Sequence, residues 1–154
     1  PTTALGEYYR VYVEDFWAGN HPVPAFDQVA DSAMAFFGKE IAANRSEPIQ
    51  FQTERAWHAG TTQGLLRLYT ERTPMEPLLS NLAMGEDYTA YILEYVTADH
   101  GKVAVLWMEW PVGCKYCTPV QPGPATNSED PLDKAVAANG RASAFIDSFR
   151  YGKD

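Results

Sequence analysis

The stretch from Tyr91 to Trp110 constrains the fold of this chain more than any other part of the sequence. Its side chains alternate in character on both sides of His100-Gly101, and successive side chains of a β-strand point to opposite faces. Pairing Asp99 with Lys102 across that turn predicts a long β-hairpin. One face of the hairpin is then wholly apolar, as a core face should be. It carries Tyr91, Leu93 and Tyr95 from the first strand, opposite Trp110, Met108 and Leu106 from the second.

The opposite face of this hairpin places Glu94 opposite Trp107, with Glu109 diagonal to Glu94. A one-residue slip of either strand would mix these carboxylates into the apolar face, which favours the register given above. On a half-exposed sheet face, two carboxylates would flank an aromatic ring, and aromatic side chains often anchor protein interfaces. We therefore predict a binding surface formed by Glu94, Trp107 and Glu109.

Two helices are predicted before the hairpins, because apolar residues recur there at steps of three and four. The first covers residues 3–18 and the second about 25–44, with Gly19-Asn20 ending the first. The apolar stripe of the first helix consists of Leu5, Tyr8, Tyr9, Tyr12 and Phe16. A short, proline-containing link makes an antiparallel helix pair the expected arrangement.

A second hairpin is predicted over residues 49–57 and 64–72, where the pattern changes to a period of two. The turn is expected to place Ala59 opposite Gly64. The following pairs would then be Trp57 with Leu66 and Arg55 with Leu68. One face of the first strand would carry Ile49, Phe51, Thr53, Arg55 and Trp57.

Asp130 is predicted to cap a last helix, with Pro131 at its first position and Gly140 interrupting its apolar stripe. The order of elements predicts a single α+β domain over residues 1–154. Its antiparallel sheet is built from two β-hairpins. Two N-terminal helices and one C-terminal helix are expected to pack on one face of that sheet.

The charge of the chain narrows the classes of partner. Its 20 acidic and 12 basic residues give a net charge of −8, and nucleic acid binding draws on Lys and Arg to neutralise phosphates. Nucleic acid is therefore not an expected partner, whereas a basic protein would be attracted. The same acidity would also serve solubility alone. No apolar run approaches the roughly 18 residues of a membrane-spanning helix.

Cys114 and Cys117 form a CxxC pair at the end of the hairpin. A thioredoxin-like redox site would need a helix starting at Cys114, and the proline-rich segment 118–128 opposes one. Structural zinc needs four ligands, of which this pair supplies two. His100 at the hairpin tip would lie ~30 Å away, at ~3.3 Å per strand residue, and nothing pairs His21 with His58. Neither a metal nor a cofactor is therefore predicted.

The remaining interpretation of Cys114 and Cys117 is a local disulfide or two unreactive thiols that stabilise the end of the strand. A disulfide would indicate an oxidising compartment, periplasmic or secreted, and a cytoplasmic location stays open. No basic stretch followed by an apolar one opens the sequence, so no signal peptide is expected within it. A start at Pro1 fits removal of an initiator Met and a processed mature end equally well.

The sequence favours a protein-binding function. It contains no glycine-rich phosphate loop, HExxH or GxSxG motif, so an enzymatic function is not predicted. The first hypothesis is a small acidic inhibitor or immunity-type protein that blocks a partner protein. One alternative is a protein that binds a sugar or an apolar molecule in a pocket lined by Trp57, Tyr91, Tyr95 and Trp110. The other alternative is a thiol redox protein that uses Cys114 and Cys117.

Overall fold

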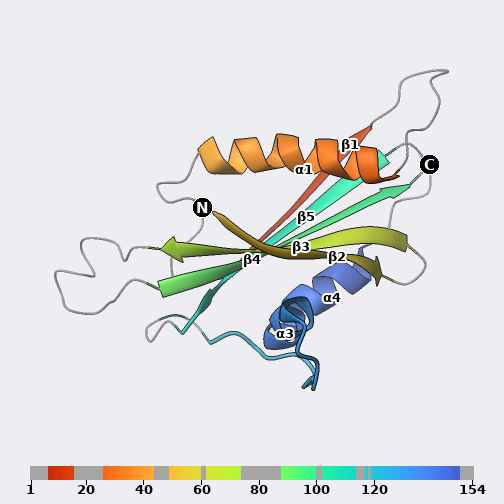
Figure 1. Ribbon diagram of the computed structural model, residues 1–154. Helices are drawn as coiled ribbons and strands as arrows, with labels where there is room; N and C mark the ends of the chain where they lie inside the picture. Colours follow the sequence, from red (N-terminus) through yellow and green to blue (C-terminus); the bar gives the residue numbers. More distant parts are fainter. Residues whose placement is uncertain are drawn as a thin grey trace.

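A computed structural model of the chain describes residues 7–15, 26–43, 49–59, 62–73, 88–99, 102–113, 117 and 119–149. Five strands and three helices occur within these residues (Figure 1). The strands are β1 (Tyr8–Asp15), β2 (Gln50–Ala59), β3 (Thr62–Thr73), β4 (Tyr88–Asp99) and β5 (Lys102–Val112). The helices are α1 (Phe26–Ala43), α3 (Pro131–Ala138) and α4 (Gly140–Ser148).

The strands form one antiparallel sheet in the order β1-β5-β4-β3-β2, so the predicted α+β class is confirmed. Helix α1 packs on one face of the sheet, and α3 and α4 pack on the other (Figure 1). The prediction that all helices share one face was therefore wrong. With both faces covered, the two sides of β4 and β5 are buried in two separate apolar clusters.

The first predicted helix is also wrong, because residues 8–15 of the interval 3–18 form strand β1. Tyr9 lies on the face of α3 and α4, where its ring is 5.3 Å from that of Phe145. Tyr8 and Tyr12 lie on the opposite face with α1. The tyrosines therefore alternate across a sheet instead of forming a helical stripe, as expected of a segment rich in aromatic and β-branched residues. The second predicted helix corresponds to α1.

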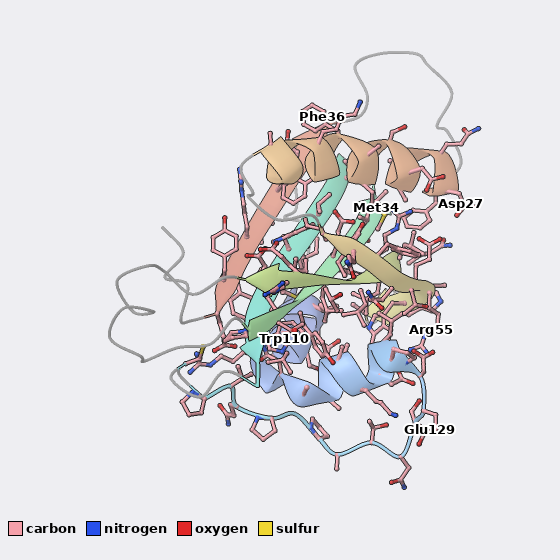
Figure 2. All side chains as sticks on the ribbon, turned by 60° about the vertical axis from the view of Figure 1, so that its left-hand side comes forward. Asp27, Met34, Phe36, Arg55, Trp110 and Glu129 are labelled. Atoms are coloured by element: carbon pink, nitrogen blue, oxygen red, sulfur yellow. The ribbon has the colours of Figure 1, made fainter. Side chains whose placement is uncertain are left out.

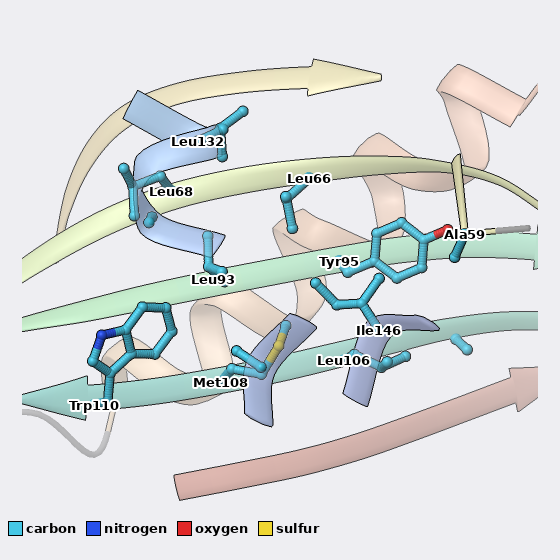
Figure 3. Close-up of a cluster of buried hydrophobic side chains, with 13 residues drawn as sticks. Ala59, Leu66, Leu68, Leu93, Tyr95, Leu106, Met108, Trp110, Leu132 and Ile146 are labelled. Carbon is cyan, nitrogen blue, oxygen red and sulfur yellow. The ribbon is translucent and has the colours of Figure 1, made fainter. Parts of the chain in front are cut away.

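The register predicted for β4 and β5 is confirmed. Asp99 pairs with Lys102, and Tyr95 pairs with Leu106. The two further predicted pairs are Leu93 with Met108 and Tyr91 with Trp110, and both are present. Figure 3 shows this face packed against Leu132 of α3 and Ile146 of α4.

The hairpin of β2 and β3 forms, but its register differs by two residues from the prediction. Trp57 pairs with Gly64 instead of Leu66. A shift of two residues keeps every side chain on its predicted face up to Thr53. Beyond that point, a bulge between Phe51 and Thr53 reverses the alternation. Phe51 therefore lies beside Tyr69, with ring centroids 5.9 Å apart, on the face opposite to the predicted one.

The predicted C-terminal helix is divided into α3 and α4 at the buried residue Asn139. Asp130 caps α3 as predicted, since its carboxylate accepts a hydrogen bond of 2.8 Å from the backbone N–H of Leu132. The side chain of Asn139 caps α4 by accepting bonds from the N–H groups of Arg141 at 3.0 Å and Ala142 at 3.2 Å. The break thus lies at an asparagine cap immediately before Gly140.

Candidate functional site

The surface predicted from Glu94, Trp107 and Glu109 is not exposed as expected. Glu94 is 0% exposed and Trp107 is 1% exposed, because α1 covers this face of β4 and β5. The Trp107 ring lies 5.5 Å from that of Phe37 on α1. Glu109 is half-buried and pairs with Ile92. The register was correct, and the exposure was wrong because a second helical layer was not foreseen.

The carboxyl group of Glu94 is the most unusual polar group of this layer. Its Oε1 accepts a hydrogen bond of 3.0 Å from the Tyr69 hydroxyl. Its Oε2 is buried and has no hydrogen-bond partner among the described residues. Burial raises the pKa of Glu94 to about 7, against the opposing effects of the Tyr69 hydrogen bond and the Arg67 charge. Perturbed carboxyl groups of this kind occur at functional sites and also in structural networks.

Arg67 connects this buried carboxyl group to the protein surface. It pairs with Glu94 across β3 and β4, and its Nε donates a hydrogen bond of 2.6 Å to Glu54. Its guanidinium also lies 3.6 Å from the carboxylate of Asp31 on α1. The arginine therefore links α1, β2 and β3 at the edge of the Glu94 layer.

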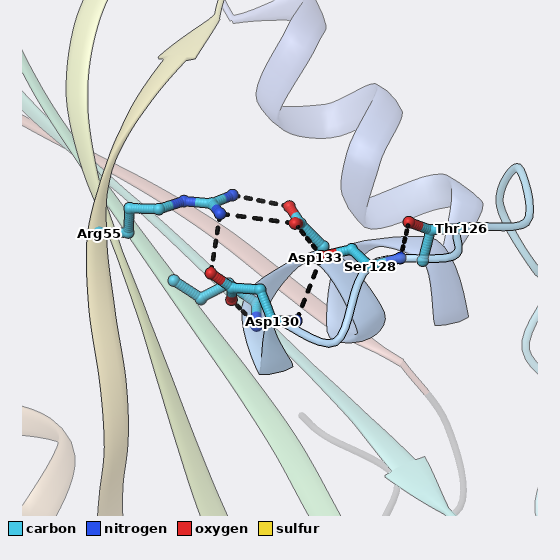
Figure 4. Close-up of polar contacts among 6 residues, drawn as sticks. Arg55, Thr126, Ser128, Asp130 and Asp133 are labelled. Carbon is cyan, nitrogen blue, oxygen red and sulfur yellow. Dashed lines mark hydrogen bonds and ion pairs between the residues drawn. The ribbon is translucent and has the colours of Figure 1, made fainter.

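A second polar cluster holds the proline-rich segment against β2 (Figure 4). Arg55 forms ion pairs of 2.8 Å with Asp130 and 2.7 Å with Asp133, and its guanidinium lies 4.9 Å from the centre of the Trp57 ring. Hydrogen bonds from Arg55 and Ser128 hold the pKa of Asp133 below its usual range. Each acid already serves as a cap or an ion-pair partner, so this cluster fits a structural role.

The outer edge of β1 is the surface that sequence reasoning missed. Among the described residues, β1 pairs with β5 on one side and with no strand on the other. On the face away from α1, Val11 is 44% exposed and Val13 is 48% exposed. The alternation in Arg10-Val-Tyr-Val-Glu14 could have revealed this strand. It was obscured because the neighbouring tyrosines also fit a helical spacing.

On the face opposite to the two valines, Tyr12 of β1 lies beside helix α1. Phe36 is exposed on the outer side of α1, whereas Met34 points toward the sheet (Figure 2). The Phe36 ring lies 6.4 Å from that of Tyr12. We define the β1 edge as Arg10 to Glu14 together with Phe36. It presents exposed apolar side chains from both a strand and a helix.

Polar contacts at Glu7 hold the start of β1 in place. The carboxylate of Glu7 accepts hydrogen bonds from the Tyr9 hydroxyl at 2.7 Å and from Nδ2 of Asn139 at 3.0 Å. Arg141 donates a further bond of 3.0 Å to the same side chain. These contacts join β1 to the junction of α3 and α4, so the edge is presented by an anchored strand.

The other sheet edge, β2, differs from β1 in a way that matters for pairing. It is bulged at Gln52, and its side chains include Glu54, Arg55 and His58. A bulge is one of the usual protections of an edge against pairing with another chain. Strand β1 has an uninterrupted register from Tyr8 to Asp15 and carries the exposed valines.

The predicted cysteine site is only partly within the described residues. Cys117 is described, and there is no free cysteine among the residues that the structure covers. Cys114 lies outside them, so the Cys114–Cys117 disulfide stays a prediction. Within the described ranges, no group of three or more His, Cys, Asp or Glu side chains is placed to hold a metal ion. None of the helices described is long and apolar enough to cross a membrane.

Comparison with known proteins found no matching family model, no matching curated protein and no matching solved structure.

Proposed function

We propose that this chain is a non-enzymatic protein-binding module that binds an extended strand of a partner protein along the β1 edge. The observation that carries the proposal is the pair of exposed valines on an edge strand with an uninterrupted register. The binding surface proposed here is therefore the β1 edge and not the buried face of β4 and β5.

Strand addition explains why such an edge would be retained. A strand added to a sheet gains main-chain hydrogen bonds along its length, and alternate side chains provide specificity. Exposed, regular edges carry a risk of aggregation, so proteins usually block them. The sheet has a bulge at β2, whereas β1 keeps an uninterrupted register and leaves Val11 and Val13 accessible at the opposite edge.

The charge of the edge refines the expected partner. The net charge of −8 would attract a basic protein over long range. At physiological salt such attraction is screened beyond about 8 Å, so the contact itself depends on local groups. The β1 edge carries a positive residue, Arg10, and a negative residue, Glu14. This favours a partner strand with complementary charges over a uniformly basic surface. An inhibitor or immunity-type role would follow if the bound strand belongs to the active region of its partner.

Affinity capture with a double variant tests this proposal. The wild-type chain and Val11→Lys/Val13→Lys are used as baits on native extract, and captured proteins are identified and rebound in purified form. We expect at least a tenfold loss of binding in the double variant. Phe51→Lys is the matched control, because Phe51 is exposed on the other edge strand. Equal binding of a purified partner to all three baits would contradict the proposal.

A second candidate function, binding of a small molecule, is supported by the buried Oε2 of Glu94, which lacks a hydrogen-bond partner among the described residues. A ligand with a hydrogen-bond donor could satisfy this oxygen beside the ring of Trp107. A pocket lined by Trp57, Tyr91, Tyr95 and Trp110 is less favoured, because Tyr95 and Trp110 are buried in the cluster that includes Leu132. Native mass spectrometry of the purified protein would reveal a retained ligand, which Glu94→Gln should release. A native mass equal to that of the chain alone would count against this candidate.

A further inference from the structure

We propose that the strand received by β1 is β1 of a second copy of this chain, paired antiparallel about a two-fold axis at Tyr12. This inference rests on the proposed function, since it names the partner of the same edge. Three features of the edge favour this partner: the register of β1, its local charges and the bulge that distinguishes β2 from it.

A two-fold axis perpendicular to the sheet joins two identical edges into one continuous antiparallel sheet. Side chains that face each other across such a pair must lie on the same face of the sheet. Residues of β1 can therefore pair only with positions of the same parity in the second copy. This condition leaves a small set of registers, each with the two-fold axis at one residue of β1. Moving the axis to the next residue shifts every pairing by two residues.

The register centred on Tyr12 makes the edge self-complementary. It places Arg10 opposite Glu14 of the second copy, and by symmetry Glu14 opposite Arg10. On the other face it places Val11 opposite Val13 of the second copy, twice. Opposite charges and β-branched pairs directly across an antiparallel pair are both stabilising. The exposed fractions of the valines, 44% and 48%, leave apolar surface for this contact.

The neighbouring registers lose these matches. Centring the axis on Val11 would place Arg10 opposite Tyr12, and centring it on Val13 would place Val11 opposite Asp15. Neither register joins Arg10 to Glu14. The sequence of β1 therefore selects one arrangement among those that the sheet geometry allows.

Helix α1 adds to the proposed contact. A two-fold axis perpendicular to the sheet places α1 of both copies on the same side. Phe36 lies 6.4 Å from the Tyr12 ring, so it would be close to the second copy. The interface would then combine main-chain pairing, two valine pairs and an aromatic side chain on α1.

Two similarly charged chains repel one another over long range, because each carries −8. Screening limits this repulsion to about 8 Å at physiological salt, while pairs in direct contact are screened less. The local pairs of Arg10 with Glu14 can therefore decide the register. At β2 the bulge at Gln52 interrupts the register, so a second strand would have fewer consecutive residues to pair with.

Sedimentation equilibrium and light scattering over a range of protein concentrations provide the test. The wild-type chain is expected to reach twice its mass of 17.1 kDa. Arg10→Glu and Glu14→Arg each place residues of the same charge opposite each other in the two copies. Each should therefore weaken dimerisation at least tenfold. Mixing the two single variants should restore a dimer, because each supplies the charges that the other lacks. The double variant Arg10→Glu/Glu14→Arg should also dimerise as the wild type does.

Lys39→Glu is the matched control, since it changes the net charge as Arg10→Glu does at an exposed position of α1. It should leave dimerisation unchanged. Circular dichroism and thermal unfolding identify any variant that fails to fold, and the mixed and double variants keep the test decisive in that case.

A monomeric wild-type chain at all concentrations would overturn self-pairing. A dimer that is insensitive to both charge reversals would overturn it as well. The proposed function fails separately: it would be contradicted if Val11→Lys/Val13→Lys changed neither self-association nor binding of a purified partner. If the wild-type chain is a monomer and a purified partner binds it but does not bind the double valine variant, the proposed function is supported. The second copy is then refuted as the partner.

Discussion

The Tyr69 hydroxyl donates a hydrogen bond of 3.0 Å to Oε1 of Glu94, whose carboxyl group is fully buried between α1 and the sheet. This single bond and the nearby charge of Arg67 oppose the cost of burying the carboxylate. Burial dominates, so Glu94 stays protonated to a higher pH in the folded protein than in the unfolded chain. The layer under α1 is therefore expected to respond to pH.

We predict that the free energy of unfolding decreases as the pH rises from about 4.5 to about 7. The pKa of Glu94 is raised from 4.5 to about 7 on folding. Below this interval Glu94 is protonated in both states, and above it Glu94 is ionised in both. Within it, the unfolded state releases the proton first, so folding becomes less favourable by up to about 3 kcal/mol. Urea unfolding at a series of pH values measures this slope.

Glu94→Gln isolates the contribution of this group. The amide keeps an acceptor for Tyr69 and cannot ionise, so the variant should lack the Glu94-dependent slope. It should be more stable than the wild type at pH 8 and close to it at pH 4. An unchanged slope would show that other groups cause the pH dependence.

Tyr69→Phe should destabilise the protein more at pH 8 than at pH 5. The substitution removes the hydrogen bond to Oε1, and a bond to an ionised group contributes more than a bond to a neutral one. We expect a loss of about 1–3 kcal/mol at pH 8, where Glu94 is ionised. Combined with Glu94→Gln, the change should cost the same at both pH values. Chemical unfolding of the four proteins at the two pH values completes this comparison.

Asp130→Ala should cost more stability than Asp133→Ala, although both acids bind Arg55. Asp130 also caps α3 through Leu132, and loss of a cap costs about 0.5–2 kcal/mol. The ion pairs of Arg55 are partly exposed, and exposed pairs contribute about 0–1 kcal/mol. Thermal unfolding of both variants tests the order. Equal losses would assign the main effect to the ion pairs instead of the cap.

Gly64→Ala should destabilise the sheet, because a Cβ at this position would collide with the ring of Tyr95. Both residues are buried, so the ring has to move within a packed core, at a cost of about 1–3 kcal/mol. Gly38→Ala is the matched control, since α1 leaves open space at that position. It should stabilise the helix by up to about 1 kcal/mol. Equal effects of both substitutions on the melting temperature would contradict the proposed collision.

The sequence predicted the register of β4 and β5 because their apolar face is continuous and excludes Glu94 and Glu109. It did not predict the register of β2 and β3, since a shift of two residues leaves the same side chains on each face. The bulge that moves Phe51 to the other face has no clear signal in the alternating pattern. A wholly apolar face thus allows the sequence to predict which side chains share a face of the sheet. The choice between registers that differ by two residues depends on contacts between the strands.

The candidate site was harder to predict than the sheet. Glu94 and Trp107 were placed correctly in the strands, but their exposure depends on α1, which covers a face that was expected to be open. Strand β1 was missed because Tyr8, Tyr9 and Tyr12 satisfy both a helical and an alternating spacing. Only pairing with β5, far along the chain, distinguishes the two.

That long-range pairing has a consequence for folding kinetics. Strands β2 to β5 each pair with their neighbours in sequence, whereas Tyr8 pairs with Glu109. Closing a long segment costs more entropy than closing a hairpin, so β1 is expected to join the sheet late. Destabilising changes in β1, such as Tyr9→Leu, should then accelerate unfolding and leave the refolding rate nearly unchanged. During synthesis, β1 would leave the ribosome before β5 and could join the sheet only after β5 had been made.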